Sequence, residues 1–233
     1  NSPLVGRGVG GGREEAALEI LDLCLSCKGC KAECPSNVDI AKLKAEFLQH
    51  HYDAHGVPFR TRLIANFTKQ MRLASLAPWA YNLVFKTPAL RRIANRTVGF
   101  HPDRTMPLLS RITLKKWFSV YRSESRMPNE ERETVNVKRK TVNVFCDEFT
   151  DYNDTEIGKK TVRLLERLGY RVVIPDHLES GRTYLSKGLV REAKTIAIEN
   201  VNRLADLVTD ESPLVGIEPS ALLTFRDEYP ELV

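Results

Sequence analysis

Apolar residues recur at helical spacing through much of the first half of the chain. Between residues 14 and 23 they fall on one face of a short helix, which would end beside Cys24. Ser36 to Asp39 resembles a capping box, with Asp in place of the usual Glu. A helix is therefore predicted from there to about His55, with Gly56 just beyond its end. Its inner face would carry Val38, Leu43, Phe47 and Leu48.

Further helices are predicted over residues 61–76 and 89–97, so the first region is expected to be all-α. Beyond residue 140 the pattern changes to short β-rich runs that alternate with helical stretches. Alternation of strand and helix predicts a parallel α/β sheet with right-handed crossovers. Strands are expected at 141–145, 171–174 and 213–217, and helices at 155–168, at 188–208 and from Pro219 onward.

A polar stretch over residues 122–140 separates the two patterns. It is rich in Ser, Glu, Arg, Asn and Lys, has few apolar residues, and is predicted to be a linker or an exposed crossing segment. The chain then divides into a helical domain (1–121), a linker (122–140) and a small α/β domain (141–233). Because the sequence does not begin with Met and ends just after a helical stretch, we expect a piece of a longer protein.

Composition is that of a globular protein, with 42% hydrophobic and 28% charged residues. Residues 1–140 carry 24 Lys and Arg against 13 Asp and Glu, whereas residues 141–233 carry 11 against 17. A basic half can indicate nucleic acid, an anionic membrane surface or an acidic partner. Because the basic residues are scattered, with no nucleic-acid motif, a solvated helical surface is favoured and no nucleic-acid partner is predicted.

Four of the five cysteines lie within eleven residues. Cys24, Cys27, Cys30 and Cys34, with Pro35 directly after, form the pattern C-x2-C-x2-C-x3-C-P. This is the bacterial ferredoxin run that binds iron-sulfur clusters. A zinc site or a disulfide pair is the alternative. Zinc sites usually gather paired ligands from two separated loops, so the iron-sulfur interpretation is favoured.

The ligand count leaves a gap. In two-cluster ferredoxins the fourth cysteine of the run binds the other cluster. Cys24, Cys27 and Cys30 would then give one [4Fe-4S] cluster three ligands, and Cys34 would give a second cluster one. The ligand set is incomplete in this sequence, so either the site holds a single unusual cluster or a partner motif lies upstream. The second explanation is favoured.

Other candidate sites carry weaker signals. His51 and His55 are four residues apart, a spacing that zinc can use, but they are expected to be surface or capping histidines near a helix C-terminus. Cys146 is expected to be a buried strand cysteine rather than a ligand. The acidic residues that follow the first strand are expected to be a helix cap and solvated acids, although open sheets bind ligands there. These acids are Asp147, Glu148, Asp151 and Asp154.

Three stretches together resemble a known family: Cys24–Pro35, Gly99–Leu109 and Asp151–Gly158. They are similar to the C-terminal iron-sulfur region of FAD-linked oxidases of the D-2-hydroxyacid (D-lactate and glycolate) dehydrogenase type. They are also similar to the iron-sulfur subunits of glycolate oxidase and anaerobic glycerol-3-phosphate dehydrogenase. The resemblance implies a helical, ferredoxin-like iron-sulfur domain followed by a small α/β domain of the cysteine-rich "CCG" type. It also implies an FAD domain on the N-terminal side and a first cysteine run that precedes the one seen here.

One departure from the family concerns the CCG domain. Glu179-Ser180-Gly181 stands where the family has Cys-Cys-Gly, and Ala221 stands where it has a later cysteine. The α/β domain is therefore expected to keep the family's fold without its cysteine ligands.

The resemblance and the cysteine run together predict the electron-transfer part of a flavin-dependent dehydrogenase, with no complete active site in this chain. Electrons would pass from FAD to a quinone or a carrier protein. The expected partners are a flavin domain or subunit and that acceptor, in the cytoplasm or at the inner face of the membrane. The alternative is a non-redox binding module in which the metal is a structural staple.

Overall fold

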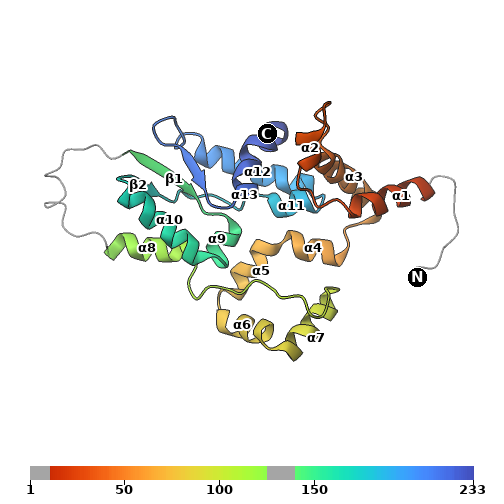
Figure 1. Ribbon diagram of the computed structural model, residues 1–233, viewed down its shortest axis with the longest axis horizontal. Helices are drawn as coiled ribbons and strands as arrows, with labels where there is room; N and C mark the ends of the chain where they lie inside the picture. The colour runs from red at the N-terminus through yellow and green to blue at the C-terminus, as the bar shows by residue number, and fades with distance from the viewer. Residues whose placement is uncertain (1–10, 125–139) are drawn as a thin grey trace, which may run out of the picture.

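The computed structural model describes residues 11–124 and 140–233. The first part is helical (Figure 1). Its helices are α1 (Gly11–Asp22), α2 (Gly29–Glu33), α3 (Ile40–His55), α4 (Phe59–Ala65), α5 (Phe67–Ala74), α6 (Pro78–Lys86), α7 (Pro88–Val98) and α8 (Leu114–Glu124). The all-α first region predicted from the periodicity is thus confirmed in its general character.

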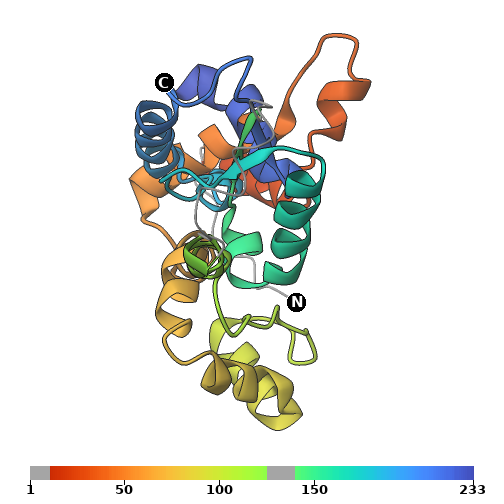
Figure 2. The same cartoon turned by 90° about the vertical axis from the view of Figure 1, so that its left-hand side faces the viewer.

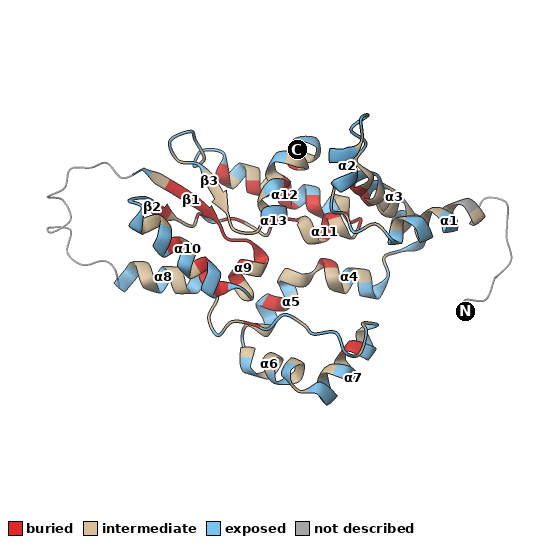
Figure 3. Cartoon of the chain, viewed as in Figure 1, coloured by how far each residue is buried: buried red, intermediate tan, exposed pale blue. Residues whose placement is uncertain are grey.

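The second part is a small parallel α/β unit, as the alternating pattern predicts. Its strands have the order β2-β1-β3, and both neighbours pair with β1 in parallel. The elements are β1 (Thr141–Phe145), α9 (Glu148–Tyr152), α10 (Thr155–Arg167), β2 (Arg171–Val173), α11 (Arg182–Ser186), α12 (Val190–Leu204), β3 (Leu214–Gly216), α13 (Pro219–Asp227) and α14 (Tyr229–Leu232). Burial is concentrated in this unit, above all along β1 (Figure 3).

Helix α8 covers the sheet. This helix was not predicted from the sequence. Trp117, Phe118 and Tyr121 pack against the core formed by the valines of β1, β2 and α10. Leu114 is fully buried where α8 approaches α10, because Gly158 leaves room there: a Cβ on Gly158 would lie 2.3 Å from Leu114 Cδ2. The predicted linker therefore overlaps the end of α8, and its residues 125–139 lie outside the described residues.

The two parts also share a hydrophobic core, which we call the shared core. Ala65 of α4 packs with Tyr184 and Leu185 of α11 and with the buried face of α12. Tyr52 and Val57 of the helical part line the same cluster. Gly188, in the connection between α11 and α12, has a φ of +72° and lies against α3. The helical part and the α/β unit are thus held together by apolar packing.

Helices α6 and α7 form a hairpin that projects from the rest of the molecule (Figure 2). The loop after α7 is fixed by Asn95, which is 1% exposed. The side-chain amide of Asn95 donates to the carbonyl oxygens of His101, Pro102 and Arg104 at 3.1, 3.0 and 2.8 Å. Helix α7 is close to its predicted bounds. Helix α6 was not predicted; Pro78 is its first residue, a position that proline favours.

Some local expectations are corrected. Asp39, rather than Ser36, caps α3: its Oδ1 accepts the Lys42 N–H at 3.0 Å. Val38 and Leu43 are exposed, because Ala41 and Ala45 form the buried face of α3. The helix predicted over 61–76 is interrupted at Asn66, whose side-chain amide donates to the Arg62 carbonyl oxygen.

None of the described helices is long and apolar enough to span a bilayer.

Candidate metal centre

The four cysteines of the run lie on the loop between α1 and α2 and around α2. Cys24 and Cys34 are half-buried, whereas Cys27 and Cys30 are exposed, and all of them are free thiols. Ser26 and Lys28 have φ values of +56° and +61°. These left-handed residues alternate with the cysteines, and such conformations turn successive backbone N–H groups toward one side, a concavity common at iron-sulfur sites. The loop thus curves around the space beside the thiols.

Gly29 does not supply this turn. It has no positive φ, and a Cβ at this position would lie 3.6 Å from Cys27 Sγ, which is ordinary contact. Lys28 adopts the left-handed conformation instead.

The Cys34 thiol has its own set of donors. The backbone N–H groups of Val38, Ser36 and Asn37 point to its sulfur and lower the pKa of the Cys34 thiol. Asn37 has a φ of +54°, which helps to form this turn. A thiolate at this position is therefore stabilised by backbone dipoles, as metal ligation requires.

The spacing of the sulfurs distinguishes kinds of metal site. In a mononuclear tetrahedral zinc site with Zn–S bonds of about 2.3 Å, the sulfurs would be about 3.8 Å apart. Among the described residues, no three cysteine sulfurs lie within 4.8 Å of one another. The cysteine sulfurs of the described loop are therefore not gathered at the spacing of a mononuclear site.

Residues from the α/β unit hold the cysteine loop in place. Arg182 of α11 donates to the Ser26 carbonyl oxygen and to Glu228 Oε1, both at 2.8 Å. Lys28 forms ion pairs with Glu228 and with Asp227, the latter at 3.4 Å. From α3, Lys44 Nζ donates to the Cys24 carbonyl oxygen at 2.7 Å.

These anchoring residues were not predicted. Ser26 and Arg182 are 156 residues apart, and no local pattern in the sequence connects them.

The carboxyl end of β1 carries a second polar cluster, which is buried. Cys146 is 2% exposed, and its N–H donates to Nε2 of His177 at 3.1 Å. Burial lowers the pKa of His177 to about 4, so the ring is neutral at physiological pH, with Nδ1–H donating to the Leu178 carbonyl oxygen. Burial also raises the pKa of the Cys146 thiol. The prediction that Cys146 is a buried cysteine is confirmed.

Asp147, Glu148 and Asp151 are buried, which corrects the expectation that these acids are solvated, whereas Asp154 is exposed. Asp147 caps α9, as it accepts the N–H groups of Phe149 and Thr150. Glu148 accepts the Ser180 N–H and hydroxyl at 3.1 and 2.8 Å. Burial raises the pKa of the Glu148 carboxyl against the opposing effect of the Ser180 donors. These buried hydrogen bonds connect the segment after β1 to the segment before α11, and they do not form a site that is open to solvent.

The proteins that the chain resembles in sequence are dehydrogenases. It is 32% identical over 216 residues to the D-2-hydroxyglutarate dehydrogenase of Escherichia coli (strain K12), an alignment that covers 91% of this chain and 20% of that protein. It is 26% identical over 225 residues to the Pseudomonas putida (strain KT2440) enzyme of the same name, covering 95% and 22%. The chain thus spans about a fifth of the length of these relatives.

A shorter similarity involves a different protein. Over 92 residues the chain is 34% identical to lactate utilization protein A of Bacillus subtilis (strain 168), covering 39% of this chain and 37% of that protein. No protein-family model matches the chain, and no solved structure matches it.

Proposed function

We propose that the chain is the iron-sulfur, electron-transfer part of a flavin-dependent dehydrogenase that oxidises a D-2-hydroxy acid. Cys24, Cys27 and Cys30 bind one [4Fe-4S] cluster and Cys34 contributes to a second, on a ferredoxin-like helical scaffold. The chain passes electrons from FAD, bound elsewhere in the protein, toward a quinone or a carrier. The names of the relatives support the substrate class, and D-2-hydroxyglutarate is the first substrate to test.

The observation that carries this proposal is the cysteine loop itself. Its spacing is that of the ferredoxin run, its left-handed residues at Ser26 and Lys28 curve it, and backbone N–H groups stabilise the Cys34 thiolate. A cluster bound there supplies reversible one-electron transfer. The protein's own contribution is to hold the thiols, exclude water from one side and fix the loop through Arg182 and Lys44.

The loop also presents a surface for the flavin part of the protein. Leu23 and Leu25 flank Cys24 and are 81% and 88% exposed. Apolar side chains beside exposed cysteines suit contact with another protein surface. Close contact there would shorten the distance over which an electron must pass. We therefore propose that the flavin domain or subunit packs on this face. A quinone acceptor would bring the protein to the inner face of the membrane.

The test separates electron delivery from substrate oxidation. In the dehydrogenase that contains this chain and its flavin part, Cys27→Ser is expected to leave reduction of FAD by substrate nearly unchanged. Delivery to the acceptor should slow markedly, because a hydroxyl is a poorer, harder iron ligand than a thiolate. Stopped-flow absorbance would follow the two steps separately.

Cys146→Ser is the matched control. Cys146 lies in the α/β unit, away from the loop, so its substitution should leave both rates unchanged and cost on the order of 1 kcal/mol in stability. If folded Cys27→Ser protein keeps both rates, any metal at the loop is a structural staple and the electron-transfer role is wrong.

A further inference from the structure

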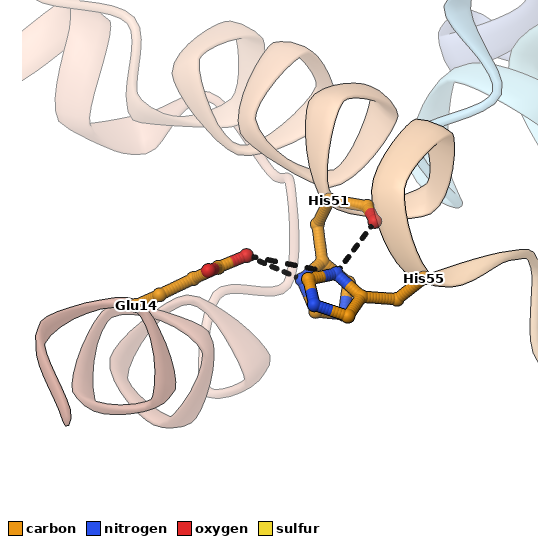
Figure 4. Close-up of side chains that lie close together, drawn as sticks. All are labelled: Glu14, His51 and His55. Atoms are coloured by element: carbon orange, nitrogen blue, oxygen red, sulfur yellow. Dashed lines mark hydrogen bonds and ion pairs between the residues drawn. The ribbon is translucent and has the colours of Figure 1, made fainter. Parts of the chain in front are cut away.

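Three side chains outside the cysteine loop converge between α1 and α3 (Figure 4). Glu14 Oε1 lies 2.7 Å from His51 Nδ1 and 3.9 Å from His55 Nδ1. The two imidazole rings come from successive turns of α3 and stack with their centroids 4.4 Å apart. One ligand atom of each residue lies within 4.8 Å of the others. Two helices thus bring two imidazoles and a carboxylate to one point.

Two histidine nitrogens and one carboxylate oxygen form a donor set that suits zinc. Zinc binds His nitrogen at about 2.0–2.1 Å and carboxylate oxygen at about 2.0–2.2 Å, so tetrahedral ligand atoms are separated by about 3.3 Å. The distances of 2.7 and 3.9 Å between the Glu14 oxygen and the two imidazole nitrogens lie on either side of that value. His55 Nδ1 also lies 3.1 Å from the His51 carbonyl oxygen, so this ring would give up that hydrogen bond and rotate to bind the ion. Two His and one carboxylate also leave a fourth position open, as in zinc sites that keep a water.

We propose that Glu14, His51 and His55 form a Zn²⁺ site that clamps α1 to α3, distinct from the cysteine loop. The Glu14 and His55 side chains are 40% and 56% exposed, so an ion can enter from solvent. The soft thiols of the loop and the imidazole–carboxylate set suit different metal chemistry. This site rests on its own geometry, and its failure would leave the proposed electron-transfer role untouched.

The position of the site suggests what the clamp does. Helix α1 leads directly into Cys24, and Lys44 of α3 binds the Cys24 carbonyl oxygen. The zinc ion would fix the other end of the same helix pair. With the ion bound, α1 is held at both ends, and the first cysteine of the loop keeps its position relative to α3.

The experiment uses Co²⁺ as a spectroscopic probe and Zn²⁺ as its competitor, on the full chain. Co²⁺ bound to nitrogen and oxygen gives visible ligand-field bands without the intense sulfur-to-cobalt charge-transfer band of a thiolate site. We expect these bands to appear on titration and to disappear when Zn²⁺ is added. His51→Gln and His55→Gln should each weaken binding by roughly tenfold or more.

His50→Gln is the matched control, because His50 is an exposed neighbour on α3 outside the group. Glu15→Gln is the control for Glu14→Gln on α1. Circular dichroism would establish that each variant is folded. If Co²⁺ binds only with thiolate charge transfer, or if its ligand-field bands are the same in His51→Gln, His55→Gln and His50→Gln, the zinc site is wrong and the three residues form only a hydrogen-bonded contact between helices.

Discussion

His177 is held neutral by its surroundings. It accepts the Cys146 N–H at Nε2 and donates from Nδ1 to the Leu178 carbonyl oxygen, and it stacks near Phe145 with ring centroids 4.3 Å apart. Burial and the positive charge of Lys115 lower its pKa from 6.5 to about 4. Protonation would leave no acceptor for the Cys146 N–H and would place a charge in the core.

A pH dependence follows. The unfolded chain protonates this histidine below about pH 6.5, whereas the folded protein resists until about pH 4, so the contribution of His177 to stability is present above pH 6.5 and lost as the pH falls through this window. The loss should reach about 3 kcal/mol by pH 4. His177→Gln, which keeps an acceptor and a donor, should lose less stability on acidification.

Chemical denaturation at several pH values between 7 and 4 would measure the difference. Both proteins share the buried carboxyl groups, so their titration cancels in the comparison. His50→Gln should follow the wild-type profile. Parallel profiles for wild type and His177→Gln would show that His177 is not the group responsible.

Single residues also show where sequence reasoning stops. The cysteine spacing and the burial of Cys146 could be predicted from the sequence. The left-handed conformation of Lys28 could not be predicted, since a lysine has no intrinsic preference for it and distant acids hold its side chain. The approach of Glu14 to His51 likewise joins residues 37 positions apart on different helices.

At the scale of elements, the α11–α12 connection lies very close to α3 at Gly188. A Cβ on Gly188 would lie 2.3 Å from Leu48 Cβ and 3.3 Å from the Ala45 carbonyl oxygen. Gly169 has a comparable positive φ of +90°, but nothing lies within 4 Å of its added Cβ. The two glycines therefore share the backbone requirement and differ only in packing.

This pair provides a controlled prediction. Gly169→Ala should cost about 1–2 kcal/mol for the left-handed conformation alone. Gly188→Ala should cost a further 1–3 kcal/mol or so, because α3 must move away from the α/β unit. Urea unfolding would give both values, and Leu48→Ala in the Gly188→Ala background should recover part of the loss. Equal costs for the two glycine variants would mean that α3 moves freely at this contact.

There is a physical reason why helix α8 was not predicted. Leu114, Trp117, Phe118 and Tyr121 follow helical spacing and face the sheet, so the sequence did carry the signal for α8. The helix was not recognised because the polar stretch predicted as a linker begins within its last turn. The three strands and their parallel direction were predicted, because each strand is a compact β-rich run between helices with polar outer faces, whereas the strand order was not.

In the whole molecule, Arg182 connects the α/β unit to the cysteine loop. Its side chain is 17% exposed, and it bonds to both Ser26 and Glu228. Arg182→Met keeps the apolar stem but removes these charged hydrogen bonds. Hydrogen exchange of the backbone over residues 24–34 should then become roughly ten- to a hundredfold faster.

Arg203→Met is the control for this prediction. Arg203, near the end of α12, pairs with Asp176 and Glu199, without a described contact to the loop. Exchange in residues 24–34 should remain at the wild-type rate in this variant. An unchanged rate in Arg182→Met would mean that Lys44 and the loop's own bonds are sufficient to order it.

The same long-range anchoring has a consequence during synthesis. Lys28 and its partner Asp227 are 199 residues apart, so at about 5–20 residues per second the ribosome needs roughly 10–40 s to make the second after the first. Through that interval the cysteine loop has been translated while its anchors do not yet exist. The thiols of the nascent chain must therefore be kept reduced and free of stray metal until the α/β unit has been translated.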